Sequence, residues 1–208
     1  MKVIEFGDPS SNTVLIQPVD DHDLSVIESE VAAIKELSGS SFHLTAIKVD
    51  NWNDDLSPWE APAVFGNEGF GGRAERMLQE INKLTGDGDK TYILGGYSLA
   101  GLFSLWAVYE TDRFSGVAAV SPSVWFPKFT DYVKKNDIQT KKIYLSLGDR
   151  EEKTGNPVMS KVGDCIREIY DYYKGEGLNC LLEWNKGNHF KEPDIRTAKG
   201  FSRVLKEI

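Results

Sequence analysis

The chain has 208 residues, of which 40% are hydrophobic and 27% are charged, a composition typical of a globular protein rather than a disordered one. Acidic residues outnumber basic residues by 32 to 24, and the resulting net charge of −8 disfavours binding to a nucleic acid. No apolar run is long enough to cross a bilayer, and residues 1–12 lack the apolar core of a signal peptide. We therefore expect a cytoplasmic protein with no membrane partner.

Strand and helix patterns alternate along the whole chain. Strands are predicted over residues 1–6, 13–19, 42–49, 91–96, 114–121, 141–148 and 179–185. Helices are predicted from a capping box at Ser25–Glu28 onward, over 74–84, 99–110 and 129–136, and from Asn156-Pro157 and Pro193 onward. Residues 50–72 are predicted to be a long loop. This alternation predicts one α/β domain over residues 1–208, with a mostly parallel sheet, helices on both faces and a functional site at the carboxyl ends of the strands.

A serine lies between small residues in the stretch LGGYSLAGL (94–102), after one predicted strand and before a predicted helix. The stretch fits the nucleophile-elbow pattern G-x-S-x-G, with Ala100 in place of the second glycine and Gly101 after it. Small neighbours are needed because the turn is tight, and such a turn exposes the serine hydroxyl at the end of the strand. We interpret Ser98 as a catalytic nucleophile, and the alternative is an ordinary packing turn.

A serine nucleophile needs a base, and the base needs an orienting acid. Of the histidines His22, His43 and His189, only His189 follows the serine, as the order Ser, acid, His requires. It lies in a glycine-containing loop after the last predicted strand. His43 falls within a strand pattern, where we expect it to pack, and His22 precedes the serine. His189 is therefore the predicted general base.

The orienting acid is expected directly after the predicted strand 141–148. Three acids follow that strand: Asp149, Glu151 and Glu152. Glu151 stands three residues after Gly148, a spacing common for the acid in such enzymes, so it is favoured. Asp149 is the alternative acid, and it has a second interpretation as a partner of the turn backbone.

The oxyanion of the reaction needs backbone donors. Leu99 begins the helix after the serine, so its N–H is the first predicted donor. The second is expected after the strand 13–19, at Asp20 or Asp21. The acids of residues 20–23 are also metal-ligand types, but neighbours in an extended loop seldom point together. We predict neither a metal nor a cofactor.

The predicted strand-end loops are rich in aromatic and acidic residues. Trp52, Trp59, Tyr97 and Trp125 are predicted to line a substrate pocket, and the alternative is that such aromatic side chains cover the sheet edge. The acids of these loops favour a neutral or cationic ester over an anionic one.

Four segments together resemble a known family. They are DLSPW (55–59), FGGRAERML (70–78), GYSLAGLFSLW (96–106) and FSGVAAVSPSVWF (114–126). In this order they resemble the esterase family of α/β-hydrolases that includes enterochelin-esterase-like and esterase D-like enzymes, the enterochelin-esterase-like branch most of all. The basic residue that often precedes the L-S-P segment in that family is absent here.

The resemblance implies the α/β-hydrolase fold without a large lid, and hydrolysis of a carboxylic ester through an acyl-serine. It implies Ser98 as the nucleophile, His189 as the base and an acid within residues 149–152. The sequence thus predicts a serine esterase with a small-molecule ester substrate. An acyltransferase or peptidase using the same triad, and a non-catalytic binding protein, remain as alternatives, and the oligomeric state stays open.

Overall fold

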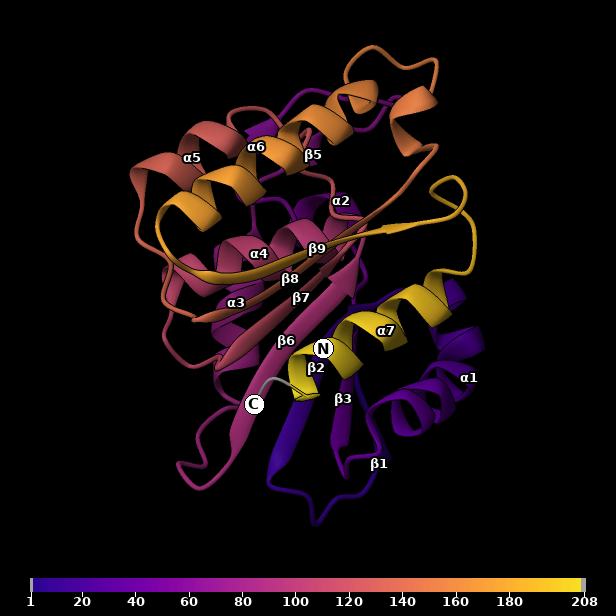
Figure 1. The fold of residues 1–208 in the computed structure, drawn as a ribbon, viewed down its shortest axis with the longest axis vertical. Coiled ribbons are helices and arrows are strands. Elements are labelled where there is room, and N and C mark those ends of the chain that lie inside the picture. Colours follow the sequence, from indigo (N-terminus) through magenta and orange to yellow (C-terminus); the bar gives the residue numbers. More distant parts are fainter. Residues whose placement is uncertain (1, 207–208) are drawn as a thin grey trace.

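The computed structural model describes residues 2–206, so Met1 of the predicted first strand and residues 207–208 of the predicted domain lie outside the described part. Seven strands form one sheet in the order β1-β3-β2-β6-β7-β8-β9 (Figure 1). Their bounds are Lys2–Gly7 (β1), Thr13–Val19 (β2), His43–Lys48 (β3), Thr91–Tyr97 (β6), Gly116–Val120 (β7), Lys142–Gly148 (β8) and Asn179–Asn185 (β9). Only β1 runs antiparallel to its neighbour; the other pairs are parallel. The mostly parallel sheet predicted from the sequence is confirmed.

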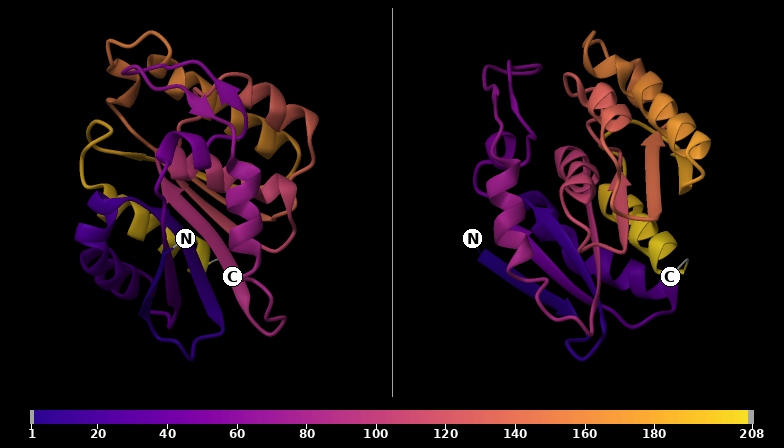
Figure 2. Two further views of the ribbon diagram at one scale, coloured as in Figure 1. Left: turned by 180° about the vertical axis from the view of Figure 1, so that it is seen from behind. Right: turned by 90° about the vertical axis from the view of Figure 1, so that its left-hand side faces the viewer.

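Helices cover both faces of the sheet, because its central strands are apolar on both sides. The bounds are Asp21–Ser38 (α1), Trp52–Asp55 (α2), Ala74–Asn82 (α3), Leu99–Glu110 (α4), Phe129–Lys135 (α5), Val162–Gly175 (α6) and Pro193–Lys206 (α7). Helices α1 and α7 pack together on one face, where Ile27, Ile34 and Phe201 belong to a buried apolar cluster. On the other face, which Figure 2 shows from behind, α3 to α6 contribute to a second cluster. Among these helices, none combines the length and apolarity needed to traverse a membrane.

The first helix begins earlier than predicted. Its capping box is formed by Asp20 and Asp23, whose carboxylates each accept the backbone N–H of the other residue. The prediction of a capping box at Ser25–Glu28 is therefore wrong. Asp20 directly follows β2, so the chain passes from strand to helix without a loop.

Two other segments differ in detail from the prediction. The long loop 50–72 contains the short helix α2 and a small antiparallel pair, β4 (Glu60–Ala61) and β5 (Phe70–Gly71). At the predicted helix start Asn156-Pro157, the Asn156 side chain accepts the N–H groups of Val158 and Met159, as a cap does. A 3₁₀ turn follows, and the α-helix itself begins only at Val162.

Candidate active site

Ser98 lies in the one-residue turn between β6 and α4. Its backbone has φ 57° and ψ −118°, a region that residues other than glycine rarely adopt. The surrounding chain holds this conformation. The Ser98 N–H donates to the carbonyl of Val120 at 3.0 Å, and the Ser98 carbonyl accepts the N–H groups of Leu102 and Ser123 at 3.0 Å each. The strained turn is therefore fixed by three backbone hydrogen bonds.

The small residues around the serine are required by close packing. A Cβ atom on Gly96 would lie 2.7 Å from Cβ of Ala100, and one on Gly101 would lie 2.9 Å from the Gly96 carbonyl oxygen. The methyl group of Ala100 thus occupies the space that the missing side chain of Gly96 leaves open. At the start of α4, the backbone of Gly101 lies so close to its neighbours that no side chain fits there.

A continuous line of hydrogen-bonding groups runs from this serine to a buried carboxylate. The Nε2 atom of His189 lies 3.0 Å from Oγ of Ser98, and its Nδ1 atom lies 2.7 Å from Oε2 of Glu151. The Glu151 side chain is 4% exposed and that of His189 is 26% exposed. The order of contacts is that of a nucleophile, a base and an orienting acid.

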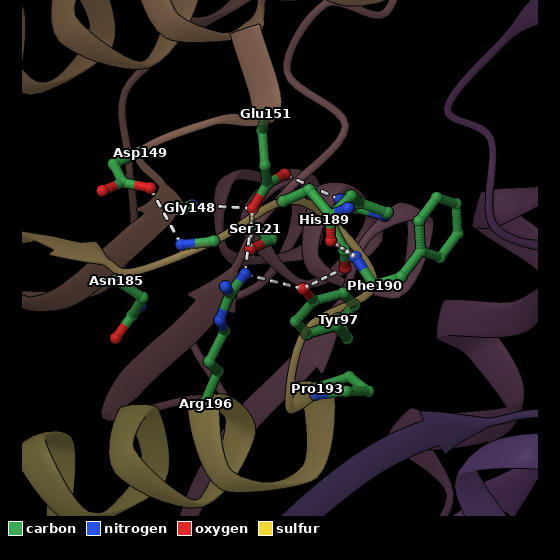
Figure 3. Close-up of polar contacts among 12 residues, drawn as sticks. Tyr97, Ser121, Gly148, Asp149, Glu151, Asn185, His189, Phe190, Pro193 and Arg196 are labelled. Atoms are coloured by element: carbon green, nitrogen blue, oxygen red, sulfur yellow. Dashed lines mark hydrogen bonds and ion pairs between the residues drawn. The ribbon is translucent and has the colours of Figure 1, made fainter. Parts of the chain in front are cut away.

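The second oxygen of Glu151 is held by three donors, which Figure 3 shows. Its Oε1 atom accepts the Ser121 hydroxyl at 2.7 Å and the Gly148 N–H at 2.7 Å, and it lies 3.2 Å from Nη1 of Arg196. Burial alone raises the pKa of Glu151. The hydrogen bonds from His189, Ser121 and Gly148, with the charge of His189, outweigh that effect and hold the pKa below its ordinary value. Glu151 is therefore ionised at neutral pH.

The other two acids considered after β8 lie apart from His189. The exposed carboxylate of Asp149 accepts the N–H of Gly187 at 2.8 Å, a bond that lowers its pKa (Figure 3). Glu152 pairs with Arg167 at 2.9 Å. Of the three candidates, Glu151 is the one in contact with the imidazole.

Tyr97 does not line the cavity that opens above Ser98 and His189, so its predicted place in the substrate pocket is wrong. The tyrosine lies at the end of β6, and its side chain points back beneath the histidine loop (Figure 3). Its hydroxyl donates to the backbone carbonyl of His189 at 2.6 Å and accepts Nη1 of Arg196 at 3.2 Å. Tyr97 thus fastens the loop that carries the histidine.

A cavity of about 630 Å³ opens above Ser98 and His189. Its wall is mostly apolar and aromatic, formed by Trp52, Phe65, Phe70, Trp125, Met159, Val162 and Phe190. Of the residues predicted to line a substrate pocket, Trp52 and Trp125 lie in this wall. The prediction is wrong for Trp59, whose indole N–H donates to the carbonyl of Pro127 at 3.0 Å while the ring packs 5.6 Å from that of Phe126. Trp59 is a packing residue behind the cavity wall.

Of the predicted oxyanion donors, Leu99 lines the cavity as the first residue of α4. Asp20 and Asp21 do not line it. The N–H of Asp20 donates to the Asp23 carboxylate at 3.2 Å within the capping box, so the prediction of a free donor at Asp20 is wrong. The carboxylate of Asp21 pairs with Lys48.

The charge of the cavity also differs from the expectation. The charged side chains that line it are Arg150, Lys153 and Glu151, and Glu151 is already paired. Asp20 caps α1 and Asp21 begins it, whereas Asp54 and Glu60 line a second hollow that shares Trp52, Phe65 and Phe70 with this cavity. The preference for a neutral or cationic ester stays a prediction. Within residues 2–206, no three His, Cys, Asp or Glu side chains gather as metal ligands do.

Three polar residues of the site were not predicted. Ser121 binds Glu151, and the hydroxyl of Ser123 lies 3.4 Å from that of Ser98. Both belong to the S-P-S segment (121–123), which is part of the family resemblance, so the sequence marks this segment but does not predict what its serines do. Arg196 lies on α7, where the helical pattern marks it only as one polar residue among several.

Comparison of the sequence gives no matching family model and no matching curated protein. Comparison of the structure does give matches. Siderophore hydrolase EstA from Aspergillus nidulans superimposes with a TM-score of 0.70 at 17% identity, over 97% of this chain and 85% of EstA. The enterobactin esterase FES from Shigella flexneri gives a TM-score of 0.64 at 16% identity, over 99% of this chain and 55% of FES. Esterase Pf2001 from Pyrococcus furiosus gives a TM-score of 0.58 at 12% identity, over 99% of this chain and 90% of Pf2001.

These likenesses establish the fold. The chain has the α/β-hydrolase fold, as the sequence predicts, and several of its solved structural neighbours are named as esterases. It spans little more than half the length of the enterobactin esterase, and most of the length of the other two proteins. At identities this low, the activity has to be argued from the chain's own residues.

Proposed function

We propose that the chain is a serine hydrolase that cleaves carboxylic esters through an acyl-serine intermediate. The observation that carries the proposal is the line of contacts from Ser98 through His189 to Glu151, at the base of a mostly apolar cavity. Ser98 is the nucleophile, His189 the general base and Glu151 the acid that orients the imidazole. The esterase names of the structural neighbours favour esters as the substrate class.

Acylation begins when Ser98 Oγ attacks the ester carbonyl and its proton passes to Nε2 of His189. Glu151 accepts the Nδ1–H, which keeps Nε2 free to take that proton, and it stabilises the imidazolium that forms. The imidazolium then gives the proton to the leaving alkoxide, so an alcohol departs and the acyl group stays on the serine. A water, deprotonated by the same imidazole, releases the acid and restores Ser98.

Negative charge on the carbonyl oxygen needs donors during both steps. The N–H of Leu99, at the start of α4, is the first donor of the proposal. The N–H of Asp20 is occupied within the capping box, and neither Asp20 nor Asp21 lines the cavity, so we assign only this first donor. Loss of one such donor costs on the order of 100-fold in kcat.

Two other functions are compatible with the fold. An acyltransferase or a peptidase uses the same three residues with a different acceptor or leaving group. A non-catalytic binding protein is the third possibility, and the unbroken contacts from serine to carboxylate argue against it, because a binding role does not need them.

Hydrolysis of small acetyl and butyryl esters by purified protein tests the proposal. Ser98→Ala and Glu151→Gln are expected to lower kcat by about 10³-fold or more. Asp149→Asn is the matched control, since that carboxylate faces Gly187 rather than the imidazole, and it should retain the activity of the parent. Equal rates for the parent and Ser98→Ala would contradict the proposal.

A further inference from the structure

Two cations flank the orienting acid on a single turn. Glu151–Lys153 form a 3₁₀ turn, closed by a hydrogen bond from the Lys153 N–H to the Arg150 carbonyl at 3.1 Å. Side chains three residues apart in a 3₁₀ turn eclipse one another, so Arg150 and Lys153 share one side of it. Both line the cavity. The turn therefore presents one buried carboxylate to His189 and two cationic side chains to the space where a substrate enters.

The backbone of this turn is tied to the loop that carries the histidine. The Arg150 N–H donates to the Gly187 carbonyl at 3.1 Å, and the Asp149 N–H donates to the Asn185 carbonyl at 2.8 Å. The Asp149 carboxylate accepts the Gly187 N–H at 2.8 Å in return (Figure 3). The two cations are thus anchored close to the reacting groups rather than on an independent loop.

The two cations have no ion-pair partner within the described chain. Neither Arg150 nor Lys153 forms an ion pair with any of residues 2–206, whereas the neighbouring Glu152 is paired with Arg167. Asp149 directly precedes Arg150 in the sequence. Its pKa is lowered first by the Gly187 hydrogen bond and then by the charges of Arg150, Lys153 and Lys186, so it offsets only part of this positive charge.

The rest of the cavity cannot supply the missing anion. Its one acidic lining residue, Glu151, is already bound to His189 and Arg196. The remaining wall is mainly aromatic, with Phe65, Phe70 and Trp125 in edge-to-face contact. The hollow that adjoins the cavity at Trp52, Phe65 and Phe70 is lined by the acids Asp50, Asp54, Glu60 and Glu68, so the positive charge belongs to the side of the cavity formed by Arg150 and Lys153.

We propose that Arg150 and Lys153 form an anion subsite, and that the substrate is an ester of apolar body carrying a carboxylate or similar anionic group. This inference rests on the proposed function for the reaction, but the binding of the anionic group does not require catalysis. Exposed cations such as these two contribute modestly to affinity, about threefold for each and about tenfold together.

Binding is measured first in the Ser98→Ala protein, which cannot form an acyl-serine. Two carboxylate esters are titrated by NMR: benzyl hydrogen adipate, with the carboxylate on the acyl part, and 4-carboxybenzyl hexanoate, with it on the alcohol part. The neutral comparators are the same molecules with that carboxyl methylated. At least one carboxylate ester should bind about tenfold more tightly than its comparator, and 0.5 M NaCl should reduce the preference because it screens exposed charges.

Charge-removing variants complete the test. Arg150→Gln and Lys153→Gln, each in the Ser98→Ala background, should reduce the preference about threefold, and the double variant should abolish it. Lys174→Gln is the control, because it removes one positive charge at an exposed position of α6, and it should leave the preference intact. Equal binding of charged and neutral esters, or a preference that survives the double variant, would overturn the subsite. If the binding preference is intact but the parent protein, which retains Ser98, does not turn over these esters, the proposed reaction is contradicted instead.

Discussion

Nη1 of Arg196 lies 3.2 Å from Oε1 of Glu151, and each of these side chains is only 4% exposed. The same guanidinium reaches the Tyr97 hydroxyl at 3.2 Å and, through Nη2, the Lys186 carbonyl at 3.2 Å. The buried guanidinium of Arg196 therefore contacts Glu151, the Tyr97 hydroxyl and the backbone of the loop that carries His189 (Figure 3).

Arg196→Met is expected to affect the pH dependence of the reaction as well as stability. Without the arginine, the Glu151 charge is shared with fewer partners and favours a protonated imidazole. The acid limb of the kcat/KM profile should then move to higher pH by about half a unit or more. Stability should fall by about 3 kcal/mol, because one partner of a buried ion pair is removed.

Arg196→Lys separates the electrostatic effect from simple loss of packing. It restores the positive charge without the forked geometry of the guanidinium, so the acid limb should return most of the way to its original pH. An acid limb that stays in place in Arg196→Met would reduce Arg196 to a structural residue.

Tyr97→Phe tests the support of the histidine loop. The change removes the 2.6 Å hydrogen bond to the His189 carbonyl and leaves that carbonyl without its side-chain donor. We expect a loss of about 1 kcal/mol in the free energy of unfolding and a severalfold decrease in kcat/KM. Tyr172→Phe, a matched change on α6, should keep full activity. Unchanged kinetics in Tyr97→Phe would mean that the loop is held by its backbone alone.

Gly96→Ala tests the packing of the serine turn. The new methyl group would lie 2.7 Å from Cβ of Ala100, so the turn has to shift. Overpacking of this kind costs about 1–3 kcal/mol, and the shift should displace Ser98 from the imidazole and lower kcat strongly. Gly86→Ala is the control, since a Cβ there meets nothing within 4 Å. Denaturant unfolding and ester hydrolysis of both variants provide the comparison.

Glu30→Gln concerns a buried acid away from the cavity. Glu30 on α1 is 3% exposed; Gln17 of β2 donates to its Oε2 at 3.4 Å, and Oε1 of each residue has no hydrogen-bond partner among the described residues. Burial raises the pKa of Glu30 well above its ordinary value. The folded protein therefore keeps this proton when the unfolded chain releases it, and stability is lost as the pH rises above the ordinary carboxyl range.

Glutamine cannot ionise, and its side chain carries an N–H donor at every pH. We expect Glu30→Gln to stabilise the protein by about 1 kcal/mol at pH 8 and by less at pH 5, as measured by urea unfolding at both values. An advantage that is larger at pH 5 than at pH 8 would show that the acid is ionised in the folded state.

Local patterns predicted the architecture well, because doubly buried strands and the serine turn have strong signatures. LGGYSLAGL combines a strand end, a strained turn and a helix start, and the structure places Ser98 between them. The start of α1 was misplaced because two patterns competed: Ser25–Glu28 matches a capping box, but Asp20 and Asp23 form the one that exists.

The parts of the site that escaped prediction depend on tertiary contacts. Arg196 reaches Glu151 across 45 residues of chain, and a helical pattern shows no sign of that contact. Trp59 and Trp125 look alike in the sequence, yet one packs behind the wall while the other forms it. The positions of Arg150 and Lys153 in the cavity wall were not predicted either, because loop composition does not tell which side chains face inward.

The central claim is that Ser98 is a nucleophile activated by His189. Mass spectrometry of the intact protein and of its proteolytic peptides, after incubation with a fluorophosphonate probe, tests it most directly. The account predicts one covalent adduct on the peptide that contains Ser98, with none in Ser98→Ala and markedly slower labelling in His189→Asn. A folded protein that remains unlabelled, or that labels equally in Ser98→Ala, would contradict it.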